Sequence, residues 1–511
     1  MASTDNRGRG LSVVPRAAGC AAAARAAMVR LARTAPLTKM ASLVKMVLLG
    51  AMVSLAAHGC VLAPPETEQE RQRLARHSEF EVPFLIRELP PLPSPASWQD
   101  LLRRAFLANG ELETAYFEWR AAMARIDQAA AWPNTSLMAG FSYVFSAGDI
   151  KSWDRSSFLF QPDPSMNLQL PVKPAQAGKV ALQDARAAGY RFLAAKFDLQ
   201  RRVLYAFYDL ALVEERIRIQ KRNVELLEGV AKSAGARVEA GASQQDLLKA
   251  QIELRLAENE LLNMEAEHRS ARAALNGLLS REPEAPLELA PTLPAARPVP
   301  ADDARLIAMG VAQNPELAAL AAQVRGRTDA IELARLRYVP DINPSIGFTG
   351  SLSQIVGVAA MLPTNIPGIE GAIAESQALL RTSLATSRQT GRDRAASFVT
   401  ALVLMRNAER QAALYQGTIL SLAEQAMNGS RASYAAGKVG YSDLIDSQRT
   451  LLNVLLTTAQ VRIEREKRLA ELEALAGTDI ETLKQPPSAP ATMPASQPAT
   501  APADILAVLE D

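Results

Sequence analysis

Cysteine and histidine are scarce in this sequence, with two and three residues respectively among 511. Two cysteines cannot form a disulfide scaffold or a cysteine-rich zinc site, and the three histidines lie far apart in the chain. We therefore expect no metal site and no cofactor. The formal net charge is only +2 and no polybasic tract is present, so we expect no nucleic-acid partner.

Aromatic residues make up only 5% of the chain, whereas hydrophobic residues make up 48% and are mainly Ala and Leu. This composition is typical of long helices rather than of an all-β core. The sequence also lacks the His-Glu-x-x-His, Gly-x-Ser-x-Gly, Cys-x-x-Cys and phosphate-loop motifs. An extracytoplasmic enzyme would need a catalytic cluster that the sequence does not show, so we expect that the protein is not an enzyme.

The apolar run Met46–Ala57 is too short to span a bilayer as a helix, which needs about 20 residues. It fits the apolar part of a secretory signal, and Ala57-His58-Gly59-Cys60 resembles the lipobox of bacterial lipoproteins. We expect residues 40–59 to be a lipoprotein signal peptide and Cys60 to be acylated, as with palmitate. The alternative is a short buried helix with an incidental cysteine.

Residues 1–39 lie upstream of the basic start of this signal and are rich in Arg and Ala. We interpret them as an unstructured extension before a true start at Met40; the alternative is an organellar transit peptide. Val61 follows the cysteine in place of the Asp that retains lipoproteins in the inner membrane. By resemblance to bacterial lipoproteins, this favours the outer membrane.

Proline is absent between Pro174 and Pro283 and again between Pro367 and Pro486. Because proline breaks helix interiors, each stretch predicts very long helices, the first running from about residue 177 to 240, or roughly 95 Å. Each stretch contains one glycine turn, at Gly241 and at Gly437 to Gly440. We expect a helical hairpin in each, with Ser243 and Ser442 capping the returning helices.

The two hairpins are copies of one another. Asp246, Leu247, Gln251 and Leu254 recur as Asp443, Leu444, Gln448 and Leu451, and the segment 109–112 recurs as 314–317. The chain is thus a tandem duplication of a unit that contains a helix, a β-hairpin, a long helix, a turn and a second helix. In the first unit, apolar residues recur in heptads from Leu247 to Leu278 and predict the packing face of the returning helix. His268 falls in this seam as a partly exposed helix-surface residue.

The hydrophobic period changes to two near residues 137–145 and 345–352, which predicts β-strands. We place the return strands at about Ser165–Pro171 and Ile355–Leu362. These segments loosely fit transmembrane strands, and the alternative is a surface hairpin that caps a helical bundle. If they enter a membrane, several chains must pool their strands, because four strands cannot close a barrel.

Taken together, the lipobox, the duplication and the turns at 240–248 and 436–449 resemble the TolC-like outer-membrane efflux proteins, over roughly residues 60–480. The resemblance implies a mainly α fold in which long antiparallel helical hairpins form an α-barrel tunnel. Two β-hairpins per chain contribute to a 12-stranded transmembrane β-barrel in a homotrimer. It further implies an exit duct in the outer membrane whose helical part lies in the periplasm. A periplasmic adaptor protein and an inner-membrane pump of the RND or ABC type would be its partners.

The resemblance also implies functional residues near the turns. Residues expected to contact the adaptor are Gly241, Ala242, Ser243, Gly437, Val439, Gly440, Tyr441 and Ser442. Acidic candidates for a ring at the closed aperture are Asp246, Asp443 and Asp446, although an Asp at a helix start also interacts with the helix dipole. Two alternatives remain open, a lipid-anchored periplasmic coiled-coil scaffold without a pore and the exit duct of a type I secretion system.

We expect the following organisation along the chain. Residues 60–94 are an extended segment, 95–282 the first repeat, 283–300 a Pro-rich linker, 301–480 the second repeat and 481–511 a disordered Pro/Ala-rich tail. The β-hairpins are expected at about 134–172 and 341–366, and the helical turns at about 241 and 437–442.

Overall fold

The computed structural model describes residues 61–132, 137–145, 148, 151–162, 168–239, 244–351 and 353–480, and the chain from Leu62 onward forms one unit. Cys60 and the expected first turn, Gly241, Ala242 and Ser243, lie outside the described residues. So does the tail beyond residue 480.

The first repeat consists of short helices followed by two very long ones. It is preceded by α3 (Thr67–Ala75), a helix within residues 60–94 where an extended segment was expected. The repeat itself contains α4 (Trp98–Ala108), α5 (Gly110–Ala130), α6 (Val172–Glu239) and α7 (Gln244–Leu278). The 68 residues of α6 correspond to a rod of about 100 Å at 1.5 Å per residue. Pro174 lies in the first turn of α6, where a missing amide hydrogen removes no helical hydrogen bond.

The second repeat has the same order of elements. It contains α8 (Asp303–Gln313), α9 (Pro315–Arg335), α10 (Ile366–Leu414), the π-helical turn η5 (Tyr415–Ile419), α11 (Leu420–Ala435) and α12 (Tyr441–Ala476). Helices α5 and α9 have 21 residues each, and the side chains of Asn109 and Asn314 cap their first turns. The predicted internal duplication is therefore confirmed.

Four antiparallel strands form one sheet in the order β1-β2-β3-β4. They are β1 (Leu137–Tyr143), β2 (Ser156–Pro162), β3 (Asp341–Thr349) and β4 (Ser353–Met361). The return strand expected at Ser165–Pro171 was wrong, because β2 lies earlier and ends at the first proline of the Pro162-Asp163-Pro164 segment. Strand β4 begins two residues before the predicted Ile355.

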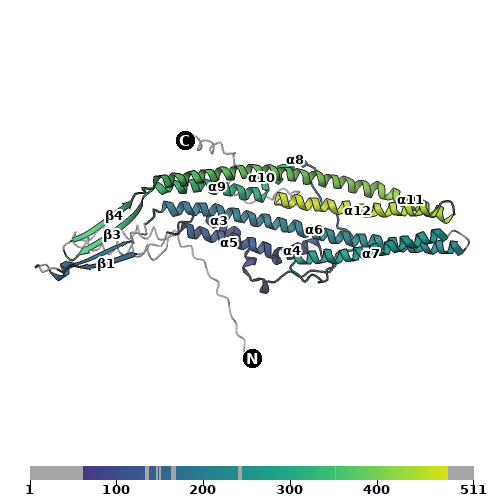
Figure 1. The fold of residues 1–511 in the computed structure, drawn as a ribbon, viewed down its shortest axis with the longest axis horizontal. Helices are drawn as coiled ribbons and strands as arrows, with labels where there is room; N and C mark the ends of the chain where they lie inside the picture. The colour runs from purple at the N-terminus through teal and green to yellow at the C-terminus, as the bar shows by residue number, and fades with distance from the viewer. Residues whose placement is uncertain are drawn as a thin grey trace, which may run out of the picture. The chain divides into compact units, whose positions relative to one another are not determined.

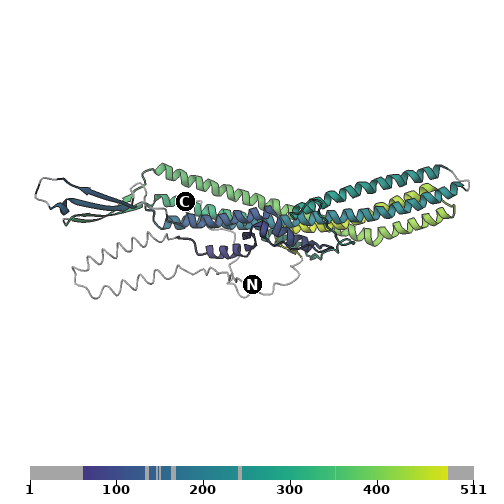
Figure 2. The ribbon, with the colours of Figure 1, turned by 90° about the horizontal axis from the view of Figure 1, so that it is seen from below.

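The long helices pack side by side in one layer (Figures 1 and 2). Helix α6 packs against α7 on one side and α12 on the other, and α12 packs against α10 and α11. Helices α5 and α9 flank α6 nearer the sheet, and α9 also contacts α10. Helices α7 and α10–α11 are thus the two edges of the layer. The sheet lies at one end of this unit, and the end of α6 and the turn between α11 and α12 lie at the other (Figure 1).

Helix α7 packs as the heptad pattern predicts. Every seam position from Leu247 to Leu278 is buried or half-buried, with Ala250, Ala257 and Met264 among the most enclosed. The seam residue His268 is half-buried, and its Nε2 lies 3.3 Å from Oε1 of Glu214 on α6. Among the described helices, none has a stretch apolar and long enough to pass through a membrane.

Candidate functional site

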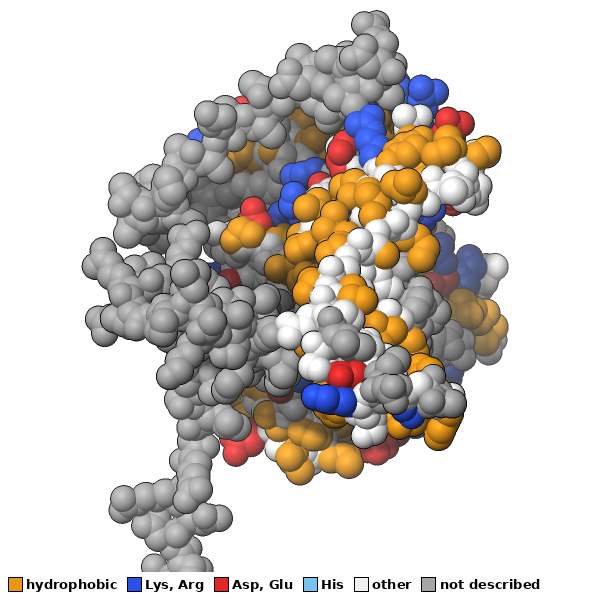
Figure 3. All heavy atoms as spheres, turned by 90° about the vertical axis from the view of Figure 1, so that its left-hand side faces the viewer, with side chains coloured by type: hydrophobic (Ala, Val, Ile, Leu, Met, Phe, Trp, Pro, Cys, Tyr) orange, Lys and Arg blue, Asp and Glu red, His pale blue; other side chains and the backbone are white. Residues whose placement is uncertain are grey.

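One face of the four-stranded sheet is apolar across all strands. The register aligns Phe141 with Phe158 and Phe348, and Phe160 with Ile346 and Val356. Directly opposed residues in antiparallel strands share a face, so these side chains form one surface. Phe141 is 62% exposed and Val356 is 79% exposed. Figure 3, which views this end of the molecule, shows apolar side chains gathered over the strands.

The opposite face of the sheet is made largely of small and polar residues. It carries Gly140, Ser142, Ser157, Ser345, Gly347, Thr349, Gly357 and Ala359, interrupted by Met138, Leu159, Ile355 and Met361. The Ser157 and Thr349 hydroxyls lie 3.0 Å apart across β2 and β3. An apolar face toward lipid and a small or polar face toward the lumen is the pattern of a transmembrane β-barrel.

The outer strands β1 and β4 each pair on one side only within the described chain. Four strands are too few to close a barrel, and open strand edges are not tolerated in lipid. The sheet therefore requires strands from other chains if its apolar face is to meet lipid.

At the opposite end of the unit, the turn between α11 and α12 is built on two glycines. Gly437 has a φ of +73°, which favours glycine, and its amide donates to the Tyr434 carbonyl at 3.0 Å. Gly440 occupies the cap position of α12, and its amide donates to Oδ2 of Asp443 at 3.3 Å. The expected capping role of Ser442 was wrong, because α12 already begins at Tyr441 and Asp443 supplies the bond to the cap residue.

The other predicted turn residues divide between the core and the surface. Tyr441 is buried, and burial raises the pKa of its hydroxyl to about 12. Val439 and Asp246 are half-buried, whereas Asp443 and Asp446 are exposed on the first turns of α12. Within a single chain, Asp443 and Asp446 are thus exposed at the end of the molecule that the turn between α11 and α12 forms, which we call the tip.

A buried chain of amide side chains lies between the hairpins near the tip, and sequence reasoning did not identify it. Gln448 on α12 donates to Asn223 on α6 at 2.7 Å, and Gln220 on α6 donates to the Ala257 carbonyl on α7 at 2.8 Å. Its only sequence signal was Gln448, which the repeat comparison paired with the exposed Gln251.

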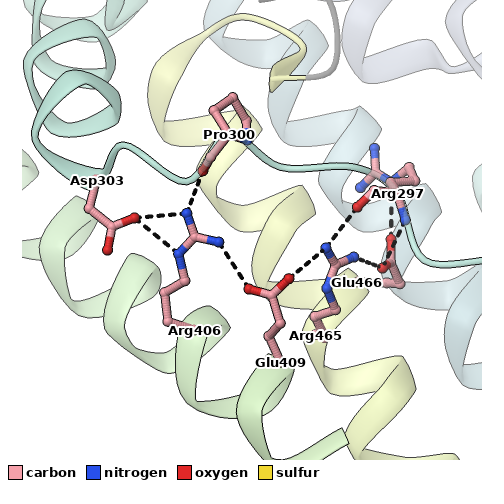
Figure 4. Close-up of polar contacts among 7 residues, drawn as sticks. All are labelled: Arg297, Pro300, Asp303, Arg406, Glu409, Arg465 and Glu466. Carbon is pink, nitrogen blue, oxygen red and sulfur yellow. Dashed lines mark hydrogen bonds and ion pairs between the residues drawn. The ribbon is translucent and has the colours of Figure 1, made fainter. Parts of the chain in front are cut away.

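A buried ion-pair network lies further from the tip and was also missed (Figure 4). Arg297, in the segment between the repeats, lies between two acids of α12: its Nη1 is 3.0 Å from Oε2 of Glu473 and its Nε is 3.2 Å from Oε2 of Glu466. The exposed fractions of these three side chains are 7%, 1% and 3%. Burial raises the pKa of Glu473 to about 7, against the opposing effect of Arg297.

The network continues from α12 to α10 and α8. Arg465 contacts Glu466, donates to the Arg297 carbonyl at 2.7 Å and lies 3.4 Å from Glu409 on α10. Arg406 lies 2.9 Å from the same Glu409 and 2.8 Å from Asp303 at the start of α8. The chain of charges shown in Figure 4 thus fixes the segment between the repeats to α10 and α12.

The described residues contain no group of three or more His, Cys, Asp or Glu side chains arranged to hold a metal ion. Two structural features bear on the function. One is a sheet with an apolar face and open edges, and the other is a pair of helical hairpins that lead away from it, the first built on the roughly 100 Å helix α6. This combination defines the class of membrane channel subunits that continue a β-barrel into a helical tunnel.

Comparisons with known proteins agree with that class. The family model described as "Outer membrane efflux protein" matches residues 101–281. The cobalt-zinc-cadmium resistance protein CzcC of Cupriavidus metallidurans is 26% identical over 383 residues, which cover 72% of this chain and 86% of that protein. The predicted resemblance to the TolC-like outer membrane efflux proteins is thus confirmed, and the homologues that these comparisons find are efflux channels and not enzymes.

Solved structures share the fold at lower identity. A structure of CusC, from a study of its folding and transmembrane channel formation, matches with a TM-score of 0.63 and 16% identity over 78% of this chain and 97% of that chain. The outer membrane protein VceC of Vibrio cholerae matches with a TM-score of 0.60 and 17% identity, over 75% of this chain and 96% of that one. The predicted fold class, with helical hairpins and two β-hairpins, is confirmed.

Proposed function

We propose that the protein is the outer-membrane exit duct of a tripartite efflux system and works as a homotrimer. The observation that carries this proposal is the four-stranded sheet with an apolar face and two open edges. Three chains supply twelve strands, enough to close a barrel with the apolar faces toward lipid. The duct conducts substrates passively from a periplasmic adaptor and an inner-membrane pump of the RND or ABC type.

The helical turns are the proposed contacts with the adaptor, because the end of α6 and the start of α12 lie at the end of the unit farthest from the sheet (Figure 1). Gly437, Gly440 and Ser442 are exposed there, and Val439 is half-buried. Asp246, Asp443 and Asp446 are proposed to line the closed aperture, where rings of acids favour cations. Replacing Asp443 with Asn should then reduce cation selectivity in single-channel recordings.

A lipid anchor at Cys60 is consistent with the path of the residues that follow it. The Leu62 amide donates to the Ala130 carbonyl at 2.9 Å, and Ala130 is the last residue of α5 before strand β1. The second residue after Cys60 is therefore fixed where the helices meet the sheet, which is the proposed lipid boundary. Cys60→Ser should abolish incorporation of labelled palmitate, and continued labelling would contradict this anchor.

The main test combines native mass with channel recording. Protein extracted from the outer membrane in detergent should have the mass of three chains and should conduct ions in planar bilayers. A protein that stays monomeric after lipid removal and never conducts would instead be the lipid-anchored scaffold. The inner-membrane pump that co-purifies distinguishes efflux from type I secretion. Cobalt, zinc and cadmium are the first substrates to test, because the relative CzcC is named for resistance to them.

A further inference from the structure

A short 3₁₀ helix before α4, Phe84–Ile86, exposes apolar side chains. Leu85 is 94% exposed and Ile86 is 72% exposed, and Phe84 beside them is also exposed. We call residues 84–86 the N-terminal knob. Adjacent apolar side chains that face water in this way are typical of an interaction surface.

The knob is held rigidly by the residue that follows it. Arg87 is buried and donates from Nη1 to the Leu107 carbonyl at 2.7 Å and from Nη2 to the Val82 carbonyl at 2.8 Å. Nη2 also lies 3.0 Å from Oε1 of Glu113 on α5. These bonds close the loop at both ends and attach it to the end of α4, so the knob is presented in one conformation.

The knob belongs to the α7 edge of the helical layer. The carbonyl of Ala108, next to the Leu107 that Arg87 contacts, accepts a hydrogen bond from Ser280 Oγ at 2.8 Å, just beyond the end of α7. Ser280 is separated from the helical turn by the whole of α7. At 1.5 Å per residue, the knob therefore lies between roughly 50 and 60 Å from the tip.

The opposite edge of the layer carries an apolar patch at the same level. Val399 and Val403, one turn apart on one face of α10, are 40% and 61% exposed. Counted back from Gly437, they also lie between roughly 50 and 60 Å from the tip. The ends of α6 and α11 lie at the same level, because Arg237 near the end of α6 donates to the Tyr434 carbonyl near the end of α11 at 2.6 Å.

Rotation about a cyclic symmetry axis leaves the height of every atom along that axis unchanged. Each edge of the helical layer therefore meets the neighbouring copy at the same distance from the helical turns. We infer that the N-terminal knob of one copy packs against Val399 and Val403 of the next copy around the ring. Nearer the tip, Leu256 on α7 and Leu422 on α11 are 60% and 59% exposed and each lies roughly 20–25 Å from the turn, so the same rule pairs them. This interface rests on the proposed trimer and adds to it a contact made by the N-terminal segment.

Disulfide trapping in full-length protein tests the contact. Chains with Leu85→Cys and chains with Val403→Cys, carrying different tags, are produced together and oxidised in the membrane. We expect a cross-linked species that contains both tags, because a disulfide forms only when the two Cα atoms approach within about 7 Å. The matched control, Leu85→Cys with Leu422→Cys, should not cross-link, since the two levels differ by roughly 30 Å.

A second pair separates this inference from the trimer itself. Leu256→Cys and Leu422→Cys chains should cross-link through the same symmetry without the knob. If they do, and no combination of position 85 or 86 with 399 or 403 does, the knob contact is refuted and the trimer stands. If neither set cross-links and the native mass is that of one chain, both proposals fail.

A double change, Leu85→Ser with Ile86→Ser, gives an independent readout. The proposed contact buries both apolar side chains, so their loss should speed dissociation of the detergent-extracted trimer by at least tenfold. The control Leu248→Ser removes an exposed side chain of α7 about 10 Å from the tip, outside the knob contact. An unchanged dissociation rate in the double variant would overturn the inference.

Discussion

Replacing Arg297 with Met should destabilise the protein more than any change at an exposed ion pair. Arg297 is enclosed between Glu466 and Glu473, and its guanidinium also lies 5.4 Å from the centre of the Trp98 ring. Met keeps most of the side-chain volume and removes the charge. Glu473, which is 1% exposed, is then left with no opposing charge at Arg297, whereas Glu466 keeps its contact with Arg465.

The expected loss is about 3–5 kcal/mol in the free energy of unfolding at pH 8, the range for breaking a buried ion pair by removing one partner. The loss should be smaller at pH 5, because a carboxyl with a raised pKa can take up a proton and so relieve the unpaired charge. In the wild type, burial raises the pKa of Glu473 from 4.5 to about 7.

The sign of the wild-type pH dependence follows from that shift. Between pH 4.5 and 7 the folded state holds a proton that the unfolded state has released. The stabilisation from Glu473 is therefore fully present below pH 4.5 and is lost as the pH rises through 7. At 1.36 kcal/mol per pKa unit, the loss amounts to roughly 3 kcal/mol. Glu473→Gln should flatten the pH dependence of the unfolding free energy between pH 5 and 8.

Urea unfolding in detergent, followed by tryptophan fluorescence at pH 5 and pH 8, measures these effects. Arg269→Ala is the control, because both partners of the Arg269–Glu284 pair are 69% exposed and the loss should stay below about 0.5 kcal/mol. The reasoning is refuted if Arg297→Met lies within about 1 kcal/mol of the wild type at pH 8. Equal losses at the two pH values would refute the role of Glu473.

Two further changes test packing and the turn. Gly310→Ala should cost about 1–3 kcal/mol of unfolding free energy in the same urea titration, because its added Cβ would lie 2.3 Å from Cε2 of Phe398. The control is Gly391→Ala, which should be neutral or stabilising because an added Cβ there has nothing within 4 Å. Asp443→Ala should destabilise by about 0.3–1 kcal/mol, because the Gly440 amide and the positive end of α12 lose a carboxylate, and a thermal midpoint equal to the wild type would contradict this role.

Much of the fold could be predicted because long helices have strong local signals. The absence of proline, the glycine turns and the heptad seam from Leu247 to Leu278 predict α6, α7, α10 and α12 without tertiary information. The strands were harder to place, since β2 contains only seven residues and its alternation of Phe158 and Phe160 directly follows the short 3₁₀ helix η3 (Ser152–Arg155). The return strand was expected at Ser165–Pro171, directly before α6, whereas β2 ends at Pro162.

The buried polar groups could not be predicted in the same way. Arg297 is separated in the chain from Glu466 by 169 residues and from Glu473 by 176, and a charged residue on a long helix is by default solvated. Only the packing of the segment between the repeats onto α12 encloses them. The amide chain from Gln448 to Asn223 likewise depends on how α6 and α12 meet.

The open edges of β1 and β4 have a genetic consequence. In a three-chain ring, each seam joins β1 of one chain to β4 of the next, so one chain with a defective edge strand spoils the barrel that its two sound partners would complete. When sound and defective chains are made in equal amounts and mix at random, only about one ring in eight contains three sound chains. Mutations that break the pairing of β1 or β4 without unfolding the helices should therefore behave as dominant, whereas those that prevent folding altogether should be recessive.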